Sequence, residues 1–269
     1  MDSTVSSVGP ARSLVRFELP AGAGLLGLLL LLSNALVDLS VAFIGLCISL
    51  YAVLASLIAR SWYPPSDQAG FGWANRVTLA RATLTIYLAA LVPLEGMLSE
   101  HLWTFMGVSL LVLTLDGVDG AVARALGSST DFGARFDMEL DAVFILILCL
   151  AVISLEIAGV WVLLIGLMRY GLIVASWRWP WLTHELPASR RRKTICVWQI
   201  VTLLIALLPI TPRWLASSAL LLALALLVYS FAVDTLWLHR KARSVHSGHQ
   251  NLSSTPSGTD AGPTTNHGD

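Results

Sequence analysis

Long apolar segments separated by short polar breaks occupy most of the chain. A helix needs about 20 predominantly apolar residues to cross a bilayer, and eight segments of the sequence come close to that length. They lie at about 20–37, 39–59, 77–95, 102–125, 136–155, 158–177, 194–211 and 214–236. Residues typical of loops, such as Pro64, Pro65 and Pro212, interrupt them. The pattern predicts an all-α, polytopic bundle of membrane helices.

The distribution of positive charge indicates how these helices cross the membrane. With the N-terminus in the cytoplasm, fifteen of the 17 Lys and Arg residues, Arg81 among them, are assigned to the cytoplasmic side. Arg213 alone is assigned to the opposite side of the membrane, and Arg169 lies within a span. Membrane proteins carry such an excess in their cytoplasmic loops, and the ten tryptophans lie near span ends, as in an aromatic belt. We expect both termini in the cytoplasm and the protein in the bacterial inner membrane.

The two ends of the chain are polar. Residues 1–19 form a predicted cytoplasmic segment, and residues 244–269, rich in Ser, Thr, Gly and Asn, predict a disordered tail. Residues 1–35 also resemble a long signal peptide with a weak cleavage site at Ser33-Asn34-Ala35. We favour an uncleaved helix, because the apolar run is long for a signal peptide and Glu18 precedes it. Residues 20–60 then form two transmembrane helices.

The amino-acid composition excludes several classes of protein. The chain is 56% apolar and only 13% charged, whereas soluble domains carry about 25% charged residues. This composition excludes a disordered protein and a disulfide scaffold, and it argues against an ordinary soluble enzyme. The net charge is zero, which leaves no basic field for binding nucleic acid. The three cysteines, Cys47, Cys149 and Cys196, have neither a disulfide framework nor the spacing of metal ligands.

Acidic residues are concentrated where the fourth predicted helix ends and the fifth begins. Six of the 17 acids fall in this window: Asp116, Asp119, Asp131, Asp137, Glu139 and Asp141. One Asp at the centre of a bilayer costs about 2.5–3.5 kcal/mol, and four cost on the order of 10 kcal/mol without compensation. This concentration therefore requires a function or a partner.

The spacing of four of these acids indicates what the partner is. Asp116 and Asp119 are three residues apart and Asp137 and Asp141 are four apart, so each pair lies on one face of its helix. Residues 126–130 predict a turn that brings all four carboxylates together at the cytoplasmic end of a helical hairpin. Such like charges repel one another unless cations neutralise them. Oxygen ligands suit Mg²⁺, Mn²⁺ or Ca²⁺, and one or two such ions indicate a pyrophosphate substrate.

Small residues around the acids leave space for a ligand. They are Gly117, Gly120, Ala121, Ala123, Gly127 and Gly133. Arg124, about one turn from the acids, is placed to bind phosphate oxygens through two hydrogen bonds. In an alternative interpretation the hairpin is held only by internal ion pairs with Arg124 and Arg135. We favour the metal site, because two arginines cannot balance four to six acids.

The whole run reads D-x2-D-G-x2-A-R-x8-G-x3-D-x3-D from Asp116 to Asp141. It matches every fixed position in the signature of the CDP-alcohol phosphatidyltransferase family, which the chain therefore resembles. The resemblance continues outward: residues 75–81 fit the N-x2-T-L-x-R entry to the first core helix, and Lys193 with Gln199 fits the entry to the fifth. It implies a six-helix core over about residues 72–240, with residues 20–60 outside it, and a homodimer.

The resemblance also implies a reaction and a set of site residues. Family members move a phosphatidyl or other substituted phosphoryl group from a CDP-alcohol, here most simply CDP-diacylglycerol, to a second alcohol and release CMP. Carried over by position, Asp116, Asp119 and Asp137 bind metal and pyrophosphate, and Asp141 binds a second Mg²⁺ or Mn²⁺ and acts as general base. The remaining donor-site residues implied are Gly120 and Ala123 beside the cytidine, Arg124 near the phosphates or carboxylates, and Gly133, Asn75 and Thr78.

The acceptor alcohol is indicated only by basic residues. Arg135, Arg169 and Lys193 predict a pocket for a small polar alcohol that is itself phosphorylated. Arg169 is the strongest of the three, because an arginine within a span usually has a function. The run from Arg190 to Lys193 is also explained by anchoring at the cytoplasmic surface.

Two other functions compete with the transferase. Intramembrane prenyltransferases bind a metal diphosphate through Asp pairs, but they normally need two clusters far apart, and this chain has one compact cluster. A divalent-cation transporter would use the four aspartates as its ion site, but it leaves Arg124 and the family signature unexplained. CMP release distinguishes the transferase from the transporter.

Overall fold

A computed structural model of the chain describes the backbone of residues 17–36, 38–61, 73–94, 96–126, 131–179 and 190–253. Within these ranges it describes the side chains except those of residues 36, 73–74, 119–126, 131, 190–193 and 239–253. Every regular element in this part of the chain is a helix. The expected all-α fold class is therefore confirmed for the described residues.

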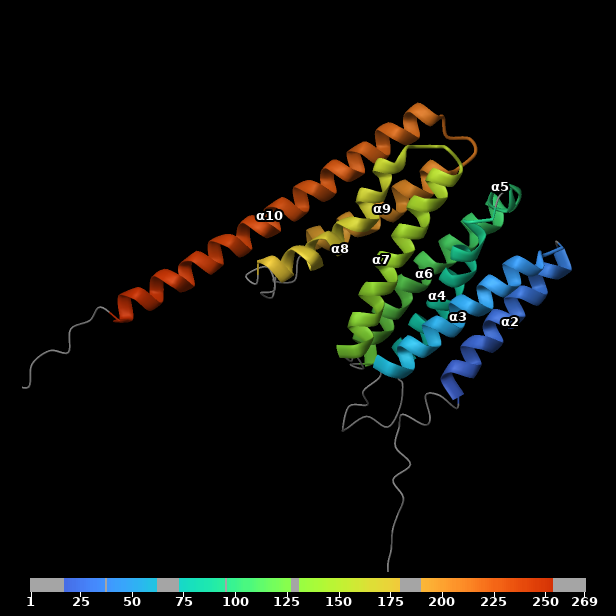
Figure 1. Cartoon of the computed structure of the whole chain (residues 1–269), viewed down its shortest axis with the longest axis horizontal. Helices are drawn as coiled ribbons and strands as arrows, with labels where there is room; N and C mark the ends of the chain where they lie inside the picture. Colours follow the sequence, from blue (N-terminus) through green and yellow to red (C-terminus); the bar gives the residue numbers. More distant parts are fainter. Residues whose placement is uncertain are drawn as a thin grey trace, which may run out of the picture.

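One long helix corresponds to each of the eight predicted segments, and the helices pack as a bundle (Figure 1). They are α2 (Leu19–Leu36), α3 (Val41–Ser61), α4 (Trp73–Leu91), α6 (Leu102–Leu126), α7 (Asp131–Ser154), α8 (Leu163–Arg178), α9 (Arg190–Leu207) and α10 (Arg213–Ser253). The short helix α5 (Met97–Glu100) lies in the connection between α4 and α6, and η2 (Val160–Val162) lies in the connection between α7 and α8. Pro93 and Pro212 lie at breaks because proline has no N–H group with which to continue a helix.

The length and apolar character of the helices make this an integral, multi-pass membrane protein. Val41–Ser61, Val160–Arg178 and Arg213–Leu238 are long and apolar enough to cross a membrane. Leu19–Ala35, Leu102–Val118 and Thr194–Leu207 are shorter apolar helical stretches. Many large apolar side chains are exposed on the bundle, such as those of Trp177 and Ile210, which is expected of a surface that contacts lipid tails.

The last helix is longer than the sequence predicts. α10 has 41 residues, and its C-terminal part extends beyond the other helices (Figure 1). Residues 244–253, predicted as part of a disordered tail, are helical, because an existing helix adds each further residue at little cost and the next proline is Pro256. At 1.5 Å per residue α10 is about 60 Å long, so part of it lies outside a hydrocarbon core of about 30 Å. Residues 1–16 and 254–269 lie outside the described residues.

α4 lies at the centre of the bundle. It packs against α2, α3, α6 and α7, and every side chain from Arg81 to Leu88 is buried. Two threonines in this stretch bond within the helix: Thr83 donates to the carbonyl of Leu79 and Thr85 to that of Arg81, at 2.9 and 2.8 Å. An unpaired buried hydroxyl is costly, so these bonds allow a partly polar helix to occupy the core.

The two N-terminal helices hold α4 from one side. Tyr87 of α4 donates a hydrogen bond of 3.0 Å to Ser33 of α2, and its ring packs edge-on against Phe43 of α3. Nearer the start of α4, Arg76 pairs with Glu18 through Nε and Nη2, with a closest contact of 2.6 Å. These contacts fix the position of α4 relative to α2 and α3.

α2 and α3 come closest together at Gly22. Tyr51 of α3 donates a hydrogen bond of 2.6 Å to the carbonyl of Leu19 in α2. A Cβ atom at Gly22 would lie 2.3 Å from the Tyr51 hydroxyl oxygen, whereas one at Gly24 would have no atom within 4 Å. The hydroxyl therefore occupies the space that a side chain at Gly22 would need.

The C-terminal helices are also joined by close packing at a glycine and by a hydrogen bond between helices. A Cβ atom at Gly166 of α8 would lie 3.0 Å from the Cα atom of Leu146, so glycine allows α8 to approach the backbone of α7. Gln199 of α9 donates a hydrogen bond of 2.8 Å to the carbonyl of Ala223 in α10, and its side chain is buried. In this structure Gln199, which fits the family pattern, ties two helices together.

We predict that Gly22→Ala destabilises the protein by about 1–3 kcal/mol, the usual effect of overpacking, because the new methyl group displaces the Tyr51 hydroxyl. Gly24→Ala is the matched control: its methyl group meets no neighbouring atom, so the substitution should leave the free energy of unfolding unchanged or raise it by up to about 1 kcal/mol. In a Tyr51→Phe background, Gly22→Ala should destabilise much less. Unfolding in detergent measures all four variants, and equal effects of Gly22→Ala in both backgrounds would contradict the packing described.

Candidate active site

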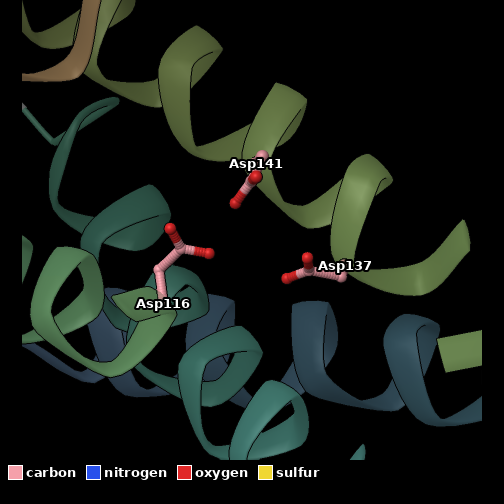
Figure 2. A group of neighbouring side chains, drawn as sticks. All are labelled: Asp116, Asp137 and Asp141. Atoms are coloured by element: carbon pink, nitrogen blue, oxygen red, sulfur yellow. The ribbon is translucent and has the colours of Figure 1, made fainter. Parts of the chain in front are cut away.

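Three carboxylates from two helices meet inside the bundle. Asp116 of α6 faces Asp137 and Asp141 of α7 (Figure 2), and one oxygen from each lies within 4.8 Å of the others. The three side chains are 25%, 37% and 26% exposed, so the cluster is half buried but remains accessible. The structure therefore brings together three of the four aspartates that the spacing places in one pocket.

The positions of these residues along their helices explain why they meet. Asp116 lies ten residues before the end of α6, and Asp141 lies ten residues after the start of α7. At 1.5 Å per residue, each lies about 15 Å from the connection between the two helices, so both are at the same level. Asp137 lies one turn closer to the connection on the same face of α7.

Arg81 of α4 pairs with all three carboxylates. Its Nη2 atom lies 2.9 Å from Asp116 Oδ1 and 2.7 Å from Asp141 Oδ1, and its Nη1 atom pairs with Asp137. The Arg81 side chain is only 1% exposed. A guanidinium keeps its charge and presents five N–H donors in one plane, so a single arginine can join acids from two helices.

The pairing of Arg81 is not evident from the sequence. The charge pattern assigns Arg81 to the cytoplasmic side, and the family motif contains it as one position, but the residue is buried beside the acids. Arg81 lies 35 positions before Asp116, so no local spacing connects them. One signal was available: Arg81 lies within a predicted span, where ionisable residues are usually paired. Of the two arginines named as internal partners, Arg135 is exposed, and the side chain of Arg124 lies outside the described residues.

A second ion pair involves Glu139, which lies between Asp137 and Asp141 in the sequence of α7. Arg169 of α8 donates through Nη2 to Glu139 Oε1 at 2.5 Å, and the two side chains are 35% and 48% exposed. The buried Nε atom of Arg169 has no hydrogen-bond partner among the described residues. Arg135 lies four residues from Glu139 and therefore on the same face of α7. The side chain of Lys193, the third acceptor candidate, lies outside the described residues.

The three carboxylates fit a hard divalent cation. Mg²⁺ and Ca²⁺ bind oxygen ligands at about 2.0–2.6 Å, so two ligands of one ion lie at most about 4–5 Å apart. One carboxylate oxygen from each of Asp116, Asp137 and Asp141 lies within 4.8 Å of the others. A carboxylate has two oxygens and can bond to a guanidinium and a cation together, so the pairing with Arg81 is compatible with metal binding.

Comparison with protein families agrees with this chemistry. Residues 71–231 match the model of the CDP-alcohol phosphatidyltransferase family. The chain belongs to this family. The match covers more than half of the sequence and includes α4, the three aspartates and Arg81, whereas α2 and α3 precede it. No curated protein and no solved structure matches the chain.

As a CDP-alcohol phosphatidyltransferase family enzyme, the protein uses a CDP-alcohol as donor and an alcohol as acceptor. Part of the family signature lies in the second half of α6, at Asp119, Gly120, Ala123 and Arg124. The side chains of these four residues lie outside the described part of the chain. The other donor-site candidates are described: Asn75 and Thr78 are buried on α4, and Gly133 is half buried on α7.

We expect Asp137→Asn to weaken Mn²⁺ binding at least tenfold, because changes to the partners of metal ligands already cost about 10–100-fold in affinity. Glu139→Gln is the matched control: it removes a carboxylate two residues away that pairs with Arg169 rather than Arg81. Calorimetry on detergent-purified protein measures both affinities. Equal Mn²⁺ affinity in wild type and Asp137→Asn would remove Asp137 from the metal site.

Proposed function

We propose that the protein transfers the phosphatidyl group of CDP-diacylglycerol to a small polar alcohol and releases CMP in phospholipid biosynthesis. The observation that carries this proposal is the convergence of Asp116, Asp137 and Asp141, within a family that acts on CDP-alcohols. Phosphoryl transfer needs mainly positioning and neutralisation of charge. A half-buried carboxylate cluster that can bind divalent ions suits both needs.

The apolar bundle supports a lipid donor. The exposed surface of the helices carries large apolar side chains, and the acyl chains of CDP-diacylglycerol can remain in the bilayer beside them. The cluster lies about 15 Å from the connection between α6 and α7, which the positive-inside pattern assigns to the cytoplasm. The head group would enter from that side, in a bacterial inner membrane under this proposal.

Asp141 is the proposed general base. The acceptor hydroxyl oxygen attacks the phosphorus that bears diacylglycerol, and its proton passes to the Asp141 carboxylate. The bond from that phosphorus to the bridging pyrophosphate oxygen breaks, and its electron pair leaves with CMP. Bound Mg²⁺ or Mn²⁺, two ions in this proposal, supplies charge neutralisation at the pyrophosphate. Asp116, Asp119, Asp137 and Asp141 would be the ligands.

The remaining donor contacts come from α4, α6 and α7. Gly120 and Ala123 would leave space for cytidine, and Arg124 would support the phosphates. Asn75, Thr78 and Gly133 would complete the site. Asn75 and Thr78 precede Arg81 at successive three-residue steps of α4, so they follow the helix from the cluster toward its N-terminal end. The catalytic core would extend over residues 72–240, with residues 20–60 as an accessory helical pair, in a homodimer.

The test of this function is CMP release from CDP-diacylglycerol in the presence of Mg²⁺ or Mn²⁺ and a panel of alcohols. Asp141→Asn should lower kcat by at least about 100-fold, because general-base catalysis contributes about 10²–10⁴-fold, while the variant still folds and binds CDP-lipid. Glu100→Gln, an exposed carboxylate on α5, is the charge control. Normal turnover by Asp141→Asn would refute its role as base, and no CMP release with any alcohol would refute the transferase.

The acceptor is proposed to be anionic, such as a phosphorylated alcohol. The side chain of Arg169 is half buried, and its Nη2 atom pairs with Glu139. Its buried Nε atom has no hydrogen-bond partner among the described residues. Arg135 is exposed on the same face of α7 as Glu139, and Lys193 is a further candidate near the start of α9. These basic groups would bind the acceptor phosphate on the face of α7 that carries Glu139.

Arg169→Gln is expected to raise KM for a phosphorylated acceptor about tenfold or more, since a hydrogen bond to a charged group is worth about 1.5–3 kcal/mol. KM for CDP-diacylglycerol should not change. Arg178→Gln removes an exposed arginine at the end of the same helix and serves as the control. Equal changes in both KM values would contradict a role specific to the acceptor.

A further inference from the structure

We propose that Arg81 is a built-in counter-cation of the carboxylate cluster, which holds the three acids together before a divalent ion binds and sets the affinity for that ion. The proposal rests on the metal site described under the proposed function. It assigns Arg81 a positioning role: the residue acts on substrate through the carboxylates and the metal that they hold.

The contacts of Arg81 are those of a bridge between helices. Nη2 contacts Asp116 of α6 and Asp141 of α7, at 2.9 and 2.7 Å, and Nη1 pairs with Asp137. The side chain is 1% exposed, so water screens these contacts little. α6 and α7 both pack against α4, and Arg81 is the point at which α4 meets the acids of both helices.

Charge balance connects this bridge to metal binding. The three carboxylates carry three negative charges and Arg81 carries one positive charge, which leaves two negative charges among these four residues. One divalent cation neutralises that remainder. Without Arg81 the same acids would carry three negative charges in a half-buried site, where like charges repel strongly.

The choice of arginine is consistent with this role. Lysine is a compact point charge on a flexible stem, whereas the guanidinium is a rigid fork that bonds to several carboxylates with defined geometry. α4 holds the fork in place, because every side chain from residue 81 to residue 88 is buried. The bridge is therefore preorganised by the core of the protein.

A fixed positive charge beside a divalent ion has two consequences of opposite sign. It stabilises the protein without metal, because it neutralises part of the acidic cluster. It also weakens metal binding, because it repels the incoming cation. A residue that only shaped the site would have a different signature, since its loss would weaken metal binding.

The test is Mn²⁺ binding and thermal unfolding of full-length protein in detergent. In the absence of metal, Arg81→Gln should unfold at a lower temperature than wild type. It should bind Mn²⁺ at least about threefold more tightly than wild type. Its unfolding temperature should therefore rise more at saturating Mn²⁺, because tighter binding stabilises the folded state more. Arg81→Lys keeps the charge and loses the fork. It should bind Mn²⁺ within about threefold of wild type while unfolding at a lower temperature without metal.

Arg76→Gln is the matched control, because Arg76 lies on the same helix and pairs with Glu18 instead of the cluster. It should leave Mn²⁺ affinity unchanged. Unchanged or weaker Mn²⁺ binding by Arg81→Gln would overturn the counter-cation role and leave the metal site in place. If Arg81→Gln does not fold, a loss of Mn²⁺ affinity greater than about threefold in Arg81→Lys overturns the counter-cation role. Absence of Mn²⁺ binding by wild type would overturn the metal site itself and the role of Arg81 with it.

Discussion

The guanidinium of Arg81 between three carboxylates is the contact on which the arrangement of the bundle depends. Asp116 comes from α6, and Asp137 and Asp141 come from α7. Charged groups are costly inside an apolar helix bundle unless they are paired. Because α4 carries the positive charge that these acids share, the central helix also organises the site. The buried residue that joins α4 to α6 and α7 therefore also lies at the carboxylate cluster.

The position of Arg81 depends in turn on how α4 is held. α2 and α3 contact α4 through Tyr87, Ser33 and Phe43, and Glu18 pairs with Arg76 near its start. These two helices precede the part of the chain that matches the family. In this protein they cover one side of the helix that carries Arg81, which gives the N-terminal pair a structural role near the site.

Much of the fold could be predicted, because a bilayer imposes a length on each helix. Each of the eight apolar segments corresponds to a long helix. For residues 244–253 composition indicates disorder, whereas α10 continues to Ser253, because an existing helix can extend through residues of modest propensity. For the site, the spacing along α7 predicts that Asp137 and Asp141 lie on one face of the helix. The spacing does not reveal their ion-pair partner Arg81, because Arg81 lies 35 positions before Asp116.

The sequence by itself determined the membrane character, the helices and the identity of the acidic residues, because apolar length and periodic spacing are local properties of a chain. Only the tertiary structure decided which cation faces those acids. Pairing between α4, α6 and α7 depends on how three helices pack, and packing brings together residues without any fixed separation in sequence. For the same reason only the folded bundle shows that Arg169 pairs with Glu139. The sequence shows only that Arg169 lies within an apolar span.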